Sequence, residues 1–112
     1  MPENGETRKE GDMWLLAFRF HDMKTAGEAY ELARDLVFGL DIEASAFRIQ
    51  VAGIPHVAVL GDAPLMPPVR DMFERSCSKG KPVELTEEVT EALFSRRAEG
   101  KIPGVFWERR SL

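Results

Sequence analysis

One long amphipathic helix between strand-like runs is the feature that most constrains how this chain can fold. From Ala26 to Leu40 the apolar residues recur at spacings of three and four, the stripe of a helix that packs one side against a core. Thr25 and Glu28 fit a capping box at its start, and Gly39 can adopt the left-handed conformation near its end. The pattern predicts a helix over 25–40 that needs an apolar surface to cover.

Three alternating runs supply that surface. Residues 13–20 are aromatic-rich and alternate, which is typical of a strand, and 45–51 and 56–60 show the same period of two. Since successive strand side chains point to opposite faces, each run has an apolar face and a smaller or more polar one. The three runs predict a sheet with one bulky face under the helix.

The turn between the second and third runs decides which side chains share a face. A three-residue loop over 53–55 pairs Val51 with Val57 and keeps the branched residues together, whereas a two-residue loop pairs Val51 with His56. We prefer the three-residue loop, because Gly53 can supply the positive φ that such turns need.

The second half of the chain repeats the pattern more loosely. A proline-rich loop precedes an apolar helical stripe that ends at Gly80, and the segment 81–85 suits an edge strand, where proline is tolerated. Thr86 caps a third helix that ends at Gly100, and an irregular apolar-then-basic arm follows over 102–112.

The resulting order, β-α-β-β-α-β-α plus an arm, predicts an α+β fold. Its first six elements match a ferredoxin-like βαββαβ two-layer sandwich, with an additional C-terminal helix and an irregular C-terminal arm. The polar, non-periodic residues 1–12 predict a disordered N-terminal tail, and 13–112 a single domain. The ferredoxin-like arrangement hosts many functions, so it indicates none by itself.

Composition narrows the class of protein. The net charge is −4, with 15 basic and 19 acidic residues, which disfavours nucleic acid as a partner. Cys77 is the single cysteine, so no internal disulfide can form, and this suits a reducing compartment. The N-terminus lacks the apolar segment of a signal peptide, and no run approaches the ~20 apolar residues of a membrane span. We expect a soluble cytoplasmic protein with no membrane partner.

The two sheet faces give the first functional hypotheses. The face assigned to the core is bulky and apolar: Trp14, Leu16, Phe18, Phe20, Phe47, Ile49, Val51, Val57 and Val59. The other face, expected to be open, is small or polar: Leu15, Ala17, Arg19, Ala46, Arg48, Gln50, His56, Ala58 and Leu60. Three interpretations stay open for it: a solvated face, a surface covered by a second copy or by the third helix and arm, and a floor for an anion.

In the anion hypothesis Arg19, Arg48 and His56 form the ligand-binding site. Arginine suits this role because its planar guanidinium can bind a carboxylate or phosphate with two hydrogen bonds. The two arginines are on strands that are not neighbours in the usual order, which weakens this interpretation.

No residue pattern indicates catalysis. His21 and His56 have no Cys or His at ligand spacing, so we expect no metal and no cofactor. Cys77 falls on an apolar helical stripe and is expected to be a buried thiol rather than a nucleophile. The aromatic residues share the core face, so base stacking on the sheet, as in RNA-binding domains, is also disfavoured.

Phe106 and Trp107 make the arm distinctive. They can pack back on the domain or anchor the chain to a partner, since tryptophan is favoured at interface hot spots. The leading hypothesis is therefore a small interaction or regulatory module without its own catalysis, acting as a homodimer or on another protein. The alternative is a small enzyme or binding domain for an anionic metabolite that uses the open sheet face.

Overall fold

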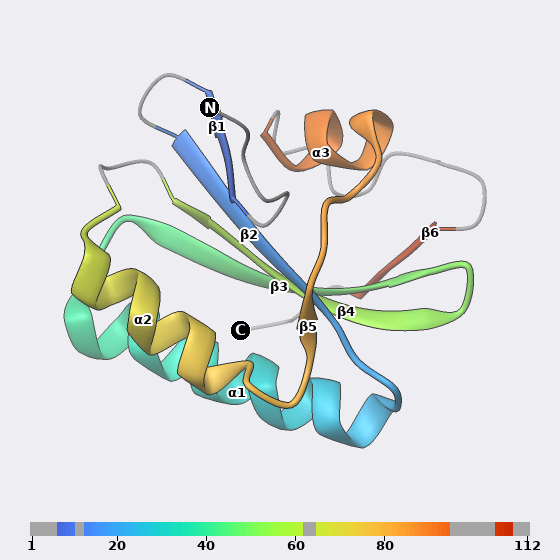
Figure 1. Ribbon diagram of the computed structural model, residues 1–112, viewed down its shortest axis with the longest axis horizontal. Helices are drawn as coiled ribbons and strands as arrows, with labels where there is room; N and C mark the ends of the chain where they lie inside the picture. Colours follow the sequence, from blue (N-terminus) through green and yellow to red (C-terminus); the bar gives the residue numbers. More distant parts are fainter. Residues whose placement is uncertain (1–6, 11–12, 62–64, 95–104, 109–112) are drawn as a thin grey trace.

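An antiparallel sheet with helices packed on it organises the α+β domain of the computed structural model (Figure 1). The structure describes residues 7–10, 13–61, 65–94 and 105–108. Its elements, in chain order, are β1 (Thr7–Glu10), β2 (Met13–Arg19), α1 (Met23–Leu40), β3 (Ala44–Val51), β4 (Ile54–Gly61), α2 (Pro67–Ser76), β5 (Lys81–Pro82), α3 (Glu87–Phe94) and β6 (Val105–Glu108).

The sheet has the strand order β1-β2-β4-β3-β6, and β5 pairs with the same edge of β2 as β1 does, farther along the strand. Each of these pairs is antiparallel. Strands β2 and β3, which α1 connects, are therefore separated by β4, and β5 lies beside β2 after α2. Helices α1 and α2 and the sheet form the two-layer α+β arrangement that the sequence predicts.

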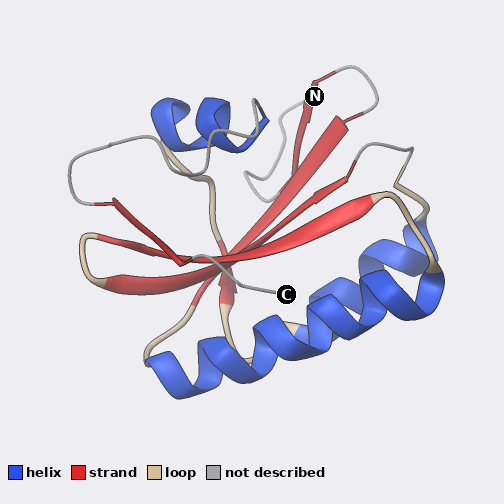
Figure 2. Ribbon diagram, turned by 180° about the vertical axis from the view of Figure 1, so that it is seen from behind, coloured by secondary structure: helices blue, strands red, loops and turns tan. Residues whose placement is uncertain are grey.

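Helices α1 and α2 form the layer on one face of the sheet (Figure 2). Their core is rich in aromatic residues, and the rings of Trp14 and Phe73 meet at a centroid distance of 6.2 Å. The buried residues of this cluster are Trp14, Leu16, Phe18, Phe20, Ala26, Ala29, Tyr30, Ala33, Val57, Val59, Phe73 and Cys77. The predicted core face is confirmed for β2 and β4.

The opposite face is not open as expected: of the three interpretations considered for it, coverage by the third helix is the one observed. Helix α3 and the segment before it cover this face (Figure 1), and they bury Ala17 and Ala58 to 3% and 0% exposure. The buried residues of this second cluster are Leu15, Ala17, Ile49, Ala58, Leu60, Leu85, Val89, Leu93 and Phe94.

The β3–β4 turn explains a second error. It has two residues, Ala52 and Gly53, both with positive φ (53° and 80°), so Val51 pairs with Ile54 rather than with Val57. Positive φ at both central positions is the geometry of a type I′ hairpin. The change from the expected pairing places the odd-numbered residues of β3 on the α3 face, since neighbouring side chains alternate between faces. The predicted assignment of Phe47, Ile49 and Val51 to the helix-covered core, and of Ala46, Arg48 and Gln50 to the opposite face, is therefore wrong.

The caps of the helices differ in part from those predicted. Helix α1 begins at Met23, because Asp22 Oδ1 accepts a hydrogen bond from Thr25 N at 2.7 Å, and it ends against Asp41, whose φ is 53°. The expected capping box at Thr25 and the glycine cap are thus replaced by two aspartates. The start of α2 at the prolines is confirmed, and so is the cap of α3, where Val89 N donates to Thr86 Oγ1.

Two segments expected to be irregular contain strands. Thr7–Glu10, within the predicted tail, pairs with β2 as β1, and Val105–Glu108, within the predicted arm, pairs with β3 as β6. The remainder of the tail and arm, and the predicted end of the third helix, lie outside the described residues. Of the helices that the structure describes, none combines the length and the apolar character needed to cross a bilayer.

Candidate functional site

The sheet register brings several candidate residues into one row at the end of the sheet where the β3–β4 hairpin turns. Arg19 lies opposite His56 on β4 and opposite Lys81 on β5, while His56 lies opposite Ile49 on β3. Residues that face each other across antiparallel strands project to the same side of the sheet. We call these four positions the cationic row.

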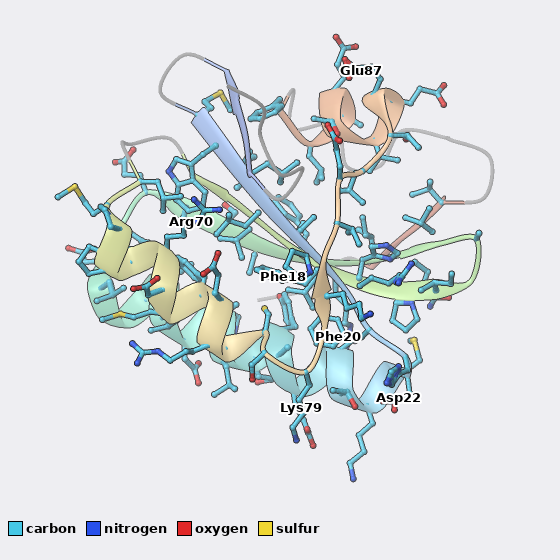
Figure 3. The ribbon with its side chains drawn as sticks, viewed as in Figure 1. Phe18, Phe20, Asp22, Arg70, Lys79 and Glu87 are labelled. Carbon is cyan, nitrogen blue, oxygen red and sulfur yellow. The ribbon has the colours of Figure 1, made fainter. Side chains whose placement is uncertain are left out.

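Arg19 and Lys81 give the row its charge. Both residues are exposed, and neither forms an ion pair with any residue that the structure describes. Directly opposite side chains have Cβ atoms about 4.5–5.5 Å apart, so two cations here repel each other. Phe18 and Phe20, on either side of Arg19, point toward α1 and α2 (Figure 3), which leaves Arg19 on the other face.

His56 adds no charge to the row near neutral pH. The residue is 6% exposed, and its Nδ1 lies 2.8 Å from the carbonyl oxygen of Ile54. Because a carbonyl only accepts, Nδ1 carries the proton and donates it. Burial lowers the pKa of His56 most; the hydrogen bond to Ile54 opposes this, and the nearby charge of Arg19 adds to the lowering. The imidazole is a neutral, buried neighbour of the two cations.

Arg48 lies on the other face of the sheet and does not join this row. Its guanidinium carbon is 5.7 Å from the centroid of the Tyr30 ring. Its Nη1 is so close to α1 that a Cβ added to Gly27 would lie only 2.8 Å from it. The expected floor in which Arg19 and Arg48 share one face is wrong, because β3 is turned over relative to the predicted register.

The other side chains considered for catalysis or metal binding have structural roles or are buried. Burial raises the pKa of the Cys77 thiol to about 12, so it remains protonated and is a poor nucleophile. The Asp22 carboxylate accepts from the Thr25 amide, which lowers the pKa of Asp22, so this carboxylate serves as a helix cap. In the described ranges, no three His, Cys, Asp or Glu side chains gather as a metal site.

The two interface candidates of the arm belong to β6. In the register Trp107 lies opposite Ile49, which extends the cationic row by one position, and Phe106 lies opposite Gln50. The side chains of both residues are outside the described part of the structure.

Sequence reasoning found Arg19 and His56 but missed Lys81. The signal that could have found it is its position: Lys81 begins the edge strand immediately after Gly80, where an added Cβ would meet the Arg19 carbonyl oxygen at 2.8 Å. A glycine with such close neighbours indicates that the chain passes tightly beside another strand. Comparisons with protein-family models, with curated proteins and with solved structures find no match to this chain.

Proposed function

We propose that the chain is a small non-catalytic interaction module that recognises an anionic group at the cationic row. The observation that carries the proposal is the pairing of Arg19 with Lys81. These two exposed cations lie directly opposite each other on β2 and β5, and neither has an ion-pair partner among the described residues. Like charges directly opposite each other destabilise a sheet by about 0.2–1 kcal/mol relative to a neutral pair. A bound carboxylate or phosphate would relieve this repulsion and would accept hydrogen bonds from the guanidinium.

The states of Cys77 and His56 support a role without catalysis. A thiol with a pKa of about 12 supplies almost no thiolate near neutral pH. The His56 imidazole is buried, and its Nδ1 proton is committed to a backbone carbonyl. Neither group is placed as a nucleophile or as a general base.

We propose a second copy of the chain as the source of the anion, giving a homodimer. Residues 84–91 contain four glutamates and no basic residue, and Glu84 and Glu88 are both exposed. The acidic segment of one protomer can meet the cationic row of another, once in each direction about a two-fold axis. Because exposed ion pairs are each worth only about 0.2–1 kcal/mol, we expect the dimer to be weak and sensitive to salt.

Charge reversal tests this dimer. Arg19→Glu with Lys81→Glu should abolish the self-association seen at low salt by analytical ultracentrifugation, and so should Glu84→Lys with Glu88→Lys. A mixture of the two variants should associate again, because each supplies the charges that the other lost. The control Lys24→Glu with Arg75→Glu has the same net charge as the first variant and should leave association intact. A wild-type chain that stays monomeric at low salt and high concentration overturns the dimer.

A small anionic metabolite is the second candidate, and the same two cations favour it. Citrate should then raise the melting temperature of a monomeric chain. The Arg19→Ala variant should lose that stabilisation and Arg48→Ala should keep it, since Arg48 lies on the other face. Stabilisation that survives in Arg19→Ala counts against the row as the site.

The other parts of the proposal concern fold, arm and compartment. The order β5-β2-β4-β3, with its two crossover helices, supports a ferredoxin-like arrangement extended by β1, β6 and α3. We include Trp107 in the proposed dimer interface only because it lies opposite Ile49, next to the cationic row. The single, buried free thiol supports a cytoplasmic location, where thiols stay reduced.

A further inference from the structure

A second cationic feature lies on the other side of the sheet from the row, between α1 and α2. A hollow of about 110 Å³ opens between the first half of α1 and the segment that ends α2 and follows it. Its lining combines two cations, three hydroxyls, one carboxylate and two apolar side chains: Thr25, Glu28, Ala29, Leu32, Arg75, Ser76, Ser78 and Lys79.

The donors of this hollow are only partly committed. Arg75 and Lys79 form no ion pair with the described residues, although Glu28 lines the same hollow. The Ser76 hydroxyl donates to the Met72 carbonyl at 3.0 Å, and the Thr25 hydroxyl is hydrogen-bonded to the Asp22 carboxylate, whereas the Ser78 hydroxyl has no hydrogen bond within the described part of the chain. Arg75, Lys79 and the Ser78 hydroxyl therefore line one hollow without a partner among the described residues, and Glu28 is the one carboxylate beside them.

From this convergence we infer that the hollow binds the phosphate group of a small phosphate monoester. Sites for whole metabolites occupy roughly 300–1,000 Å³, so a hollow of about 110 Å³ holds one group of a ligand rather than all of it. Arginine, lysine and hydroxyl donors are the groups that bind phosphate oxygens. Leu32, which is 53% exposed at the rim, offers an apolar contact for the ester substituent.

Glu28 limits the affinity of this site. Its carboxylate repels the phosphate dianion. The effect of removing this charge therefore distinguishes the hollow from a basic surface without a carboxylate. Removing the charge with Glu28→Gln should tighten binding, while removing either cation should weaken it. Each single change should alter the dissociation constant about two- to fivefold, the effect expected of one exposed ion pair.

The test is a titration of the ¹⁵N-labelled full chain with inorganic phosphate and with phenyl phosphate, followed by amide chemical shifts. The shifts should move most at Thr25, Ser78 and Lys79. Arg75→Ala and Lys79→Ala should weaken both ligands, and Glu28→Gln should strengthen both. Leu32→Ser should reduce the preference for phenyl phosphate over inorganic phosphate.

Lys81→Ala is the matched control, since it removes one charge from the cationic row but none from the hollow. It should leave the shifts at Thr25 and Ser78 unchanged, which separates this site from the proposed function. The inference fails if millimolar phosphate moves none of these amides. It also fails if Lys81→Ala weakens binding as much as Lys79→Ala does, because the phosphate would then bind at the row.

Discussion

The two faces of the sheet are covered in different ways. Under α1 and α2 the contacts include large rings, such as Trp14 against Phe73. Under α3 the sheet presents two alanines, Ala17 and Ala58, and the described part of that helix is Glu87–Phe94. Because alanine side chains are small, the helix can approach the sheet closely at these two positions. Arg19, at the end of β2, stays exposed on this face.

Truncating the α3 cover should have the largest effect. Leu93 is completely buried, so Leu93→Ala should lower the free energy of unfolding by about 2–5 kcal/mol, the usual cost of such a cavity. Leu16→Ala, which truncates an equally buried leucine on the aromatic face, is the control and should cost a similar amount. Urea denaturation measures both. If Leu93→Ala instead changes stability by less than about 0.5 kcal/mol, as a surface substitution does, α3 does not cover this face.

The aromatic face should tolerate added volume poorly. Gly61 lies opposite Trp14, and a Cβ at Gly61 would overlap the indole ring. We expect Gly61→Ala to destabilise the fold by about 1–3 kcal/mol, the range for overpacked cores. Gly39→Ala is the control, because open space surrounds that position of α1, and it should stabilise by about 0.5–1 kcal/mol through helix propensity. Equal effects of the two substitutions on the melting temperature would contradict the tight packing at Trp14.

Periodicity predicted the elements better than it predicted which face each side chain occupies. The faces of β2 and β4 were predicted correctly, because their aromatic and branched residues, such as Trp14, Phe18 and Val57, do pack under α1 and α2. On β3 the apolar residues Phe47, Ile49 and Val51 alternate clearly with polar ones, but this pattern does not show which face they occupy, because both faces of the sheet are covered. The choice then depends on the turn, where Ala52 adopts a positive φ that its residue type does not suggest.

That turn assigns the β3 side chains to the two faces, and it can be tested directly. Ala52→Asn creates an Asn-Gly pair, the strongest sequence signal for a type I′ turn, and should stabilise the hairpin by roughly 1 kcal/mol. Ala52→Val should destabilise it, because a β-branched residue fits a positive φ poorly. Opposite shifts of the melting temperature support the two-residue turn. Stabilisation by valine would indicate an extended residue at this position and the longer loop.

The candidate site depends on the same turn. Arg19 and His56 could be placed on one face from β2 and β4 alone, but Arg48 could not, because its face changes with the register of β3. Lys81 was beyond sequence reasoning for a different reason. A two-residue strand carries no alternation, so nothing local indicates which residue of β5 lies opposite Arg19.

The smallest expected effect is on the pH dependence of stability. It comes from His56, which is buried beside the exposed Arg19 at the end of the face that α3 covers. Burial, and to a lesser degree Arg19, lowers the pKa of His56 below the ordinary 6.5. The unfolded chain therefore binds the proton more tightly, so the stability that His56 contributes is complete above pH 6.5 and falls as the pH decreases through the lowered value. Unfolding by urea at a series of pH values should show this fall between pH 6.5 and the carboxyl range near 3.8, where Asp22 begins to contribute. His56→Gln should remove the slope, and Arg19→Gln should make it shallower, since the nearby positive charge no longer opposes protonation. An undiminished slope in His56→Gln would mean that another group causes it, and that the imidazole is not buried at this end of the sheet.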